Sequence, residues 1–183
     1  MRKFDYTFLK KISVPADIMN SATSIYEMKA KAELRRTDFA DVFSAMESVA
    51  KIQSVKSSNA IEGIITTDKR IRDIVNKSTA PQGHNELEIA GYRDALDLIH
   101  GSYSDIPFSE KSILELHRML LQPSGDDLAG KYKTEDNFIM ETDRRGVRSV
   151  RFTPVPASET SAAMEQLILA YHAAYSESEI NPL

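Results

Sequence analysis

The chain has 183 residues, of which 42% are hydrophobic and 27% are charged, a composition that fits one ordinary folded domain and excludes a disordered tail or a collagen-like repeat. Its 23 basic and 27 acidic residues give a net charge of −4 without a long block of one sign, so we expect no nucleic-acid partner. The absence of cysteine excludes a disulfide scaffold, a thiolate nucleophile and a zinc finger, and we expect a reducing, cytoplasmic compartment.

Two long helices are predicted in the first third of the chain. Apolar residues three or four apart predict a helix from Pro15 to about Arg35. The same spacing behind Thr37-Asp38 predicts a second helix that runs into Glu62 and stops at Gly63. The expected inward positions are Ile18, Ala22, Ile25, Met28 and Ala32 in the first helix and Phe39, Val42, Met46, Val49 and Ile52 in the second.

Two further helices are expected before residue 102. Thr66-Thr67 predicts the start of a short third helix that carries Ile71, Ile74 and Val75. Asn85 with Glu88 resembles a capping box and predicts the start of a fourth helix, which Gly101 would end. The inward face of this fourth helix consists of Ile89, Tyr92, Leu96 and Ile99.

The remaining chain predicts two helices that flank one β-hairpin. Ser109 is expected to cap a fifth helix, and Ser158 a sixth. Residues 137–141 and 147–152 read as strands on either side of a loop over 142–146 that contains a glycine. The expected inward residues are Ile113, Leu116, His117 and Leu120 in the fifth helix and Met164, Leu167, Tyr171 and Tyr175 in the sixth. The fold class is therefore mainly α, with a single hairpin.

Several common chemistries find no support in the sequence. The stretch 125–132 nearly matches a phosphate-binding loop, but Tyr132 cannot supply the small hydroxyl that binds Mg²⁺, so we interpret it as a polar loop. The four histidines form no helical ligand pair, and no metal site is expected. His117 is interpreted as a hydrogen-bonded histidine at the edge of the core. No stretch reaches about 18 apolar residues, and we expect neither a secretion signal nor a membrane span.

The predicted hairpin leaves three interpretations open. Its four arginines, which alternate with acids, fit a solvated face with salt bridges. Its unpaired edges fit the addition of a strand from a partner protein, and its arginines with two phenylalanines fit nucleic acid less well. Among functional roles, strand addition is favoured.

The end of the second helix carries the sharpest local pattern. Ser58 and Glu62 are four residues apart, so they share one helix face about 6 Å apart along the axis. The carboxylate of Glu62 stands at the negative end of the helix dipole, which costs about 0.3–1 kcal/mol unless a cation compensates it. Glu62 is then either simply hydrated or available to form an ion pair with an arginine.

These residues resemble a known family. Ser58-x-x-x-Glu62-Gly63 resembles the [ST]-x-x-x-E-[GN] inhibitory motif of Fic-domain proteins, in the form whose inhibitory helix precedes the Fic core. Four later stretches resemble helices and the hairpin of the same family in order. They are E-I-A-G-Y-R-D-A-L from Glu88, L-H-R-M-L from Leu116, G-K-Y-K from Gly130 and N-F-I from Asn137. The resemblance covers about residues 50–183 and implies a helical extension over 1–50, followed by an incomplete Fic-like core over 51–183.

The resemblance implies a multi-helix Fic-like bundle whose complete enzyme is a nucleotidyltransferase that binds ATP and Mg²⁺ and moves AMP to a hydroxyl of a target protein. Ser58, Glu62 and Gly63 would form the autoinhibitory site, in which the glutamate pairs with the last arginine of the catalytic loop. The hairpin at about 137–152 would be the flap that holds a segment of the target. Its expected contact residues are Asn137, Phe138, Ile139, Met140, Val150 and Phe152.

One departure from the family decides the expected activity. The catalytic signature H-P-F-x-[DE]-G-N-G-R is absent from the 183 residues, so no catalytic residue is predicted and we expect no activity and no cofactor for this chain alone. The final Asn181-Pro182 resembles a helix start, and the chain resembles a Fic protein cut before its active site. We also expect self-association, since such a cut exposes apolar surface.

Two alternatives to this fragment remain. The chain is a stand-alone, antitoxin-like module that acts on a Fic partner in trans, or a helical interaction domain without any link to AMP transfer.

Overall fold

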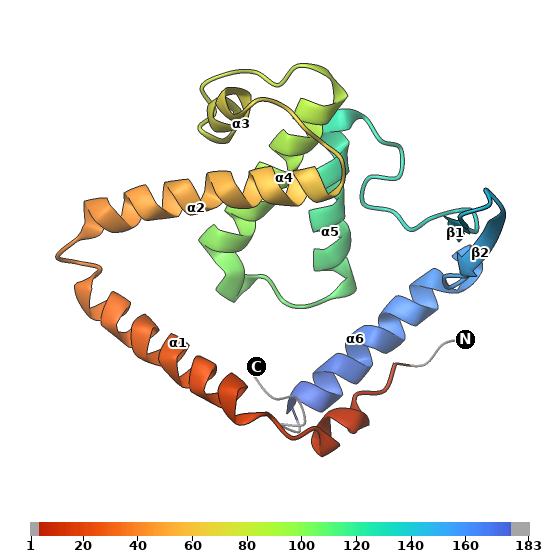
Figure 1. Cartoon of the computed structure of the whole chain (residues 1–183), viewed down its shortest axis with the longest axis horizontal. Helices are drawn as coiled ribbons and strands as arrows, with labels where there is room; N and C mark the ends of the chain where they lie inside the picture. The colour runs from red at the N-terminus through yellow and green to blue at the C-terminus, as the bar shows by residue number, and fades with distance from the viewer. Residues whose placement is uncertain (1–3, 177–183) are drawn as a thin grey trace. The chain divides into compact units, whose positions relative to one another are not determined.

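The computed structural model describes residues 4–176, which are mainly α-helical (Figure 1). These residues form six α-helices and one two-stranded antiparallel hairpin, as the sequence predicts. The elements are α1 (Ala16–Arg35), α2 (Ala40–Ile61), α3 (Asp68–Val75), α4 (Gly83–Ser102), α5 (Glu110–Leu121), β1 (Ile139–Thr142), β2 (Arg148–Phe152) and α6 (Thr160–Ser176). No helix in this part of the chain is both long and apolar enough to cross a bilayer. The predicted helix start at Asn181-Pro182 lies outside the described residues.

The described residues fall into two compact units. One contains residues 11–100, and the other contains residues 4–10 and 101–176. The boundary between residues 50 and 51, which the family resemblance implies between the helical extension and the Fic-like core, falls inside α2. This boundary stays a prediction.

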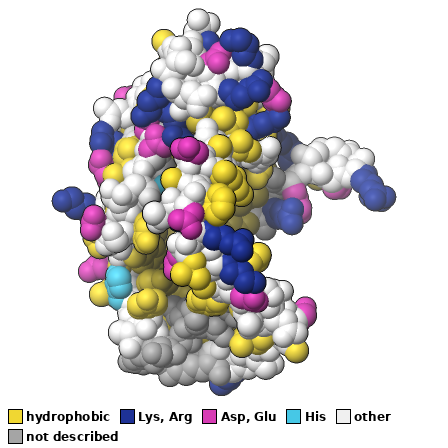
Figure 2. Space-filling view, turned by 90° about the vertical axis from the view of Figure 1, so that its left-hand side faces the viewer, with side chains coloured by type: hydrophobic (Ala, Val, Ile, Leu, Met, Phe, Trp, Pro, Cys, Tyr) yellow, Lys and Arg dark blue, Asp and Glu magenta, His cyan; other side chains and the backbone are white. Residues whose placement is uncertain are grey.

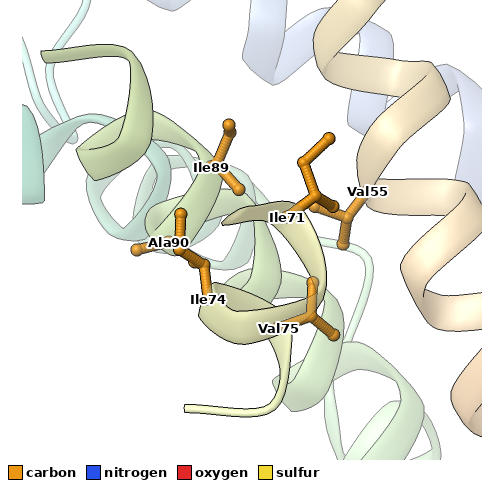
Figure 3. Packing of buried hydrophobic residues seen from close by; sticks show 6 residues of the cluster. All are labelled: Val55, Ile71, Ile74, Val75, Ile89 and Ala90. Carbon is orange, nitrogen blue, oxygen red and sulfur yellow. The ribbon is translucent and has the colours of Figure 1, made fainter. Parts of the chain in front are cut away.

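The core of the 11–100 unit is built where α2, α3 and α4 meet (Figure 3). Val55 of α2, Ile74 of α3 and Ile89 of α4 are fully buried, and the rest of the cluster is Ile71, Val75 and Ala90. The short helix α3 begins as predicted, because the hydroxyl oxygen of Thr67 accepts a hydrogen bond from the backbone N–H of Arg70 at 3.3 Å. Three of the eight residues of α3 are buried. Because so short a helix is unstable in isolation, this packing is what stabilises it.

The predicted inward stripes of α1 and of the first half of α2 are not buried. Ile25 is 60% exposed and Met46 is 63% exposed, and in α1 only Ala22 is buried. The helices themselves are confirmed, but Met46 lies nine residues before the buried Val55. At about 100° per residue, this spacing puts the two side chains on opposite sides of α2. The core therefore covers one side of α2, where the predicted inward residue Ile52 packs against it, and leaves the other predicted residues uncovered, namely Phe39, Val42, Met46 and Val49.

The predicted boundaries of α4 are wrong at both ends. The helix begins at Gly83, which takes a φ of 70°, and it continues through Gly101 to Ser102. The predicted capping box does not form, because Asn85 is the third residue of the helix, and the Glu88 carboxylate instead contacts His84 at 3.0 Å. A carboxylate two residues earlier, that of Glu86, accepts from the backbone N–H of Gln82 at 2.7 Å and satisfies the helix start.

The other unit is organised by α5 and α6. The hydroxyl oxygen of Ser109 caps α5, as predicted, by accepting from the N–H of Ser112 at 3.2 Å. The ring of Tyr171 on α6 lies 4.6 Å from that of Phe108 and is the centre of an aromatic group. The start of α6 differs from the prediction, since a short 3-10 turn over Ala157–Glu159 precedes it and Ser158 is not its cap. Tyr175, expected to face inward, is 67% exposed.

Residues 4–10 are held to this second unit by one side chain of α6. The amide oxygen of Gln166 accepts from the backbone N–H of Phe4 at 2.6 Å. The amide nitrogen of the same side chain donates to the backbone oxygen of Phe4 at 2.8 Å. Gln166 thereby satisfies both polar groups of one residue that is 162 positions away in the sequence.

The hairpin is confirmed, with shorter strands than predicted. Asn137 and Phe138 precede β1, so they are not strand residues. Ile139 pairs with Phe152 and Met140 with Val150, which leaves Arg151 as the extra residue of a β-bulge. Every residue of both strands is exposed.

Candidate functional site

The C-terminal end of α2 is fixed by its own backbone. Gly63 has a φ of 79°, which only glycine adopts without cost. The N–H of Gly63 donates to the oxygen of Ala60 at 3.1 Å, and the N–H of Ile64 donates to the oxygen of Asn59 at 2.9 Å. These two bonds are those of a Schellman motif, which satisfies the last carbonyls of the helix. The predicted stop at Gly63 is confirmed, and the direction of the helix end is set.

A hydrogen bond joins Ser58 to the neighbouring helix α4. The Tyr92 hydroxyl donates to Oγ of Ser58 at 2.9 Å, and the ring of Tyr92 packs against the core cluster. On the next residue, the buried amide of Asn59 donates to the oxygen of Val55 at 2.8 Å. Ser58 is therefore half-buried and oriented, whereas our sequence analysis assigned Tyr92 only to an inward face and missed this contact.

Glu62 occupies the C-cap position, one residue after the end of α2. Its side chain is exposed, and within residues 4–176 it makes no ion pair and no side-chain hydrogen bond. The carboxylate lies at the negative end of the helix dipole, so a cation placed there would be stabilised by both the carboxylate charge and the dipole. The predicted place of Glu62 at the helix end is thus observed, and its predicted role stays a prediction.

A partly buried ion pair joins Arg70 of α3 to Glu86 of α4. The Arg70 guanidinium contacts both carboxylate oxygens of Glu86, at 2.8 Å for Nε, and it also donates to Thr79 at 2.9 Å. The guanidinium and the N–H of Gln82 hold the pKa of Glu86 down at about 2. No local sequence pattern indicated this network, since Arg70 and Glu86 are 16 residues apart. It ties α3 and the loop after it to α4, the helix that carries Tyr92.

The hairpin is the second candidate site. Its apolar side chains are exposed, with Phe138 at 54% and Val150 at 52%, and the outer edge of each strand has no paired strand among the described residues. The interpretation as a solvated face with salt bridges agrees with the exposure of the strands, but the four arginines form no ion pair within residues 4–176. The open edges keep the interpretation as a strand-addition site available. Of the expected contact residues, Ile139, Met140, Val150 and Phe152 are strand residues, while Asn137 and Phe138 lie in the segment before β1.

Two other side chains that the sequence singles out, His117 and Tyr132, form hydrogen bonds in the second unit. The backbone N–H of Gly130 donates to Nδ1 of His117 at 3.2 Å, and the Tyr132 hydroxyl donates to Glu110 at 2.9 Å. The first contact confirms the interpretation of His117 as a hydrogen-bonded histidine. Burial, together with the second contact, raises the pKa of Tyr132 to about 12. No group of three metal-binding side chains occurs among residues 4–176.

An open groove of about 720 Å³ lies beside α2 in the 11–100 unit. Its charged walls are already paired, because Lys51 contacts Asp97 and Arg36 contacts Glu47. A groove without an unpaired charge gives no indication of a specific ligand.

Comparison with models of known protein families gives no match, and comparison with curated protein sequences gives none either. The α2 end and the hairpin are therefore the two places in the described residues whose geometry bears on function.

Proposed function

We propose that this chain is the regulatory and target-binding part of a Fic-type protein AMP transferase. The observation that carries the proposal is Glu62, which is exposed at the C-cap of α2 without a cation within residues 4–176. The Ser58-x-x-x-Glu62-Gly63 pattern supports it, since the family uses this glutamate to hold a catalytic arginine.

The geometry suits capture of a guanidinium. The Schellman motif at Gly63 and the bond from Tyr92 to Ser58 fix the backbone of the last turn, so only the side chain of Glu62 has to be ordered when it binds. An arginine at this position would add a charge-assisted, two-point hydrogen bond to the attraction of the helix end. The arginine would then be unable to contact the phosphates of ATP, and AMP transfer would stop.

The hairpin would serve the same enzyme as a flap. A target segment that adds to an edge of β1 or β2 gains main-chain hydrogen bonds, while the exposed Met140 and Val150 offer apolar contacts. This arrangement would hold a target hydroxyl near bound ATP and Mg²⁺ in the complete enzyme. No catalytic residue is assigned to the present chain, because the signature H-P-F-x-[DE]-G-N-G-R is absent from it.

The test is inhibition in trans. The purified chain is added to a Fic enzyme from which the inhibitory helix has been removed, and AMP transfer from labelled ATP is measured. We expect inhibition by the wild-type chain and a half-inhibitory concentration about 10–100-fold higher for Glu62→Gln, the loss of one charged hydrogen-bond pair.

Asp41→Asn is the matched control, since Asp41 is an exposed acid at the opposite end of α2. It removes the same charge and should leave inhibition unchanged. Equal inhibition by wild type and Glu62→Gln, or no inhibition by the wild type, would contradict the proposal.

A further inference from the structure

Two apolar stripes lie uncovered on the 11–100 unit. The α1 stripe consists of Ile18, Met19, Ile25 and Tyr26, which surround the small Ala22 at spacings of three or four residues. The α2 stripe consists of Phe39, Val42, Met46 and Val49. These eight large side chains are between 46% and 63% exposed, and a four-residue turn over 36–39 joins the two helices. Figure 2 views the side on which α1 and α2 meet, and patches of hydrophobic side chains are visible there between polar and charged ones.

The α2 stripe does not belong to the core of its own unit. Val55 on the opposite side of α2 already faces the core cluster, so α2 is apolar on two sides. A helix that is apolar on both sides is normally buried on both sides. The core cluster takes no residue from α1 within the described chain, and around the buried Ala22 the four large side chains of the α1 stripe are 46–60% exposed.

The size of the stripes fits a dimer. Half-exposed aromatic side chains offer roughly 100 Å² each and the aliphatic ones roughly 70 Å² each, which gives about 600 Å² per copy. This area is as large as the largest apolar patch of a typical monomer. Two copies would bury about 1,200 Å² of apolar surface, the lower bound of a stable interface before any rim contacts are counted.

The charges of the two helices also permit a second copy. α1 carries three acids and three bases, and α2 carries two of each, so each helix is neutral although the whole chain has a net charge of −4. On α1 these charges pair within the helix, Lys31 with Glu27 at 2.6 Å and Lys29 with Glu33 at 4.0 Å. Identical surfaces of this kind can meet without the repulsion that the net charge would otherwise cause.

We propose that the α1 and α2 stripes join two copies of this chain in a symmetric dimer. The dimer brings two helices from each copy together, and the seven-residue spacings from Ile18 to Ile25 and from Val42 to Val49 match the seams of such bundles. This inference is independent of the function proposed above.

The experiment measures the mass of the full chain by light scattering and sedimentation between about 1 and 100 µM. The wild type should approach twice the chain mass of 20.5 kDa. Ile25→Lys and Met46→Lys each place a charge in a stripe at a site that is exposed in the single chain, 60% and 63% respectively. Each should weaken dimerisation about a hundredfold.

The matched controls are Ser24→Lys and Ser48→Lys, which add the same charge at exposed positions on the other sides of α1 and α2. Both should dimerise like the wild type. Circular dichroism checks that all variants fold. The melting temperature of the wild type should also rise with protein concentration, while those of the stripe variants should not.

A wild-type chain that stays monomeric at 100 µM would overturn the proposal and leave a different protein as the occupant. A dimer that both stripe variants leave intact, or that both controls weaken equally, would overturn it as well.

Discussion

The hydrogen bond from Tyr92 to Ser58 can be measured by a double-mutant cycle. Tyr92→Phe removes the donor and leaves Ser58 half-buried, which should cost about 1 kcal/mol of unfolding free energy. Ser58→Ala removes the acceptor, with a cost partly offset by the higher helix propensity of alanine, about 0.5 kcal/mol. Once Tyr92 is phenylalanine, Ser58→Ala has no bond left to break. We therefore expect a coupling energy of about 1 kcal/mol.

The assay is urea unfolding followed by circular dichroism, with all four proteins measured at one concentration. Ser57→Ala is the control, because Ser57 is an exposed neighbour on the same helix and forms no bond to Tyr92. Its effect should add to that of Tyr92→Phe within about 0.3 kcal/mol. Additive effects of Ser58→Ala and Tyr92→Phe would refute the view that this bond fixes the end of α2.

Three further outcomes are expected. Gly130→Ala should lower the free energy of unfolding by about 2–4 kcal/mol, since Gly130 has a φ of 72° and a Cβ there would lie 2.8 Å from Cβ of Arg118. The control Gly125→Ala, at a φ of 79° with open space around it, should cost only about 1 kcal/mol. Equal costs in thermal or urea unfolding would argue against the clash. The folded-state pKa of Glu86 is about 2, below its unfolded value, so its contribution to stability is present above about pH 4.5 and is lost as the pH falls towards 2; Glu86→Gln should flatten this part of a stability-against-pH curve, and an unchanged curve would contradict the assignment. Amides of the exposed hairpin should exchange with deuterium at least about tenfold faster than those of α3, and equal protection would show that the hairpin is covered.

Local patterns predicted the elements whose ends are settled by neighbouring residues. Thr67 and Ser109 cap their helices through contacts three residues away, and Gly63 stops α2 through bonds within five residues. The sequence also placed Glu62 at the helix end. In these cases the interaction that decides the structure lies within the window that a pattern covers.

The predictions fail where contacts between residues far apart in the sequence decide the structure. α4 starts early because Glu86, held by Arg70 from another helix, accepts from the chain before it. The partner of Ser58 was missed because Tyr92 is 34 residues away. Helical periodicity identified the apolar side of α1, yet it cannot say whether anything covers that side. The family resemblance and the roles that it implies stay predictions.

The clamp that Gln166 forms on Phe4 has a consequence for tolerance to change at the beginning of the chain. The glutamine side chain bonds to the backbone N–H and the backbone oxygen of Phe4, as a neighbouring strand in a sheet would. Neither bond involves the aromatic ring. We therefore expect most residues to replace Phe4 without loss of these two hydrogen bonds. Proline is the exception, since it has no N–H to offer.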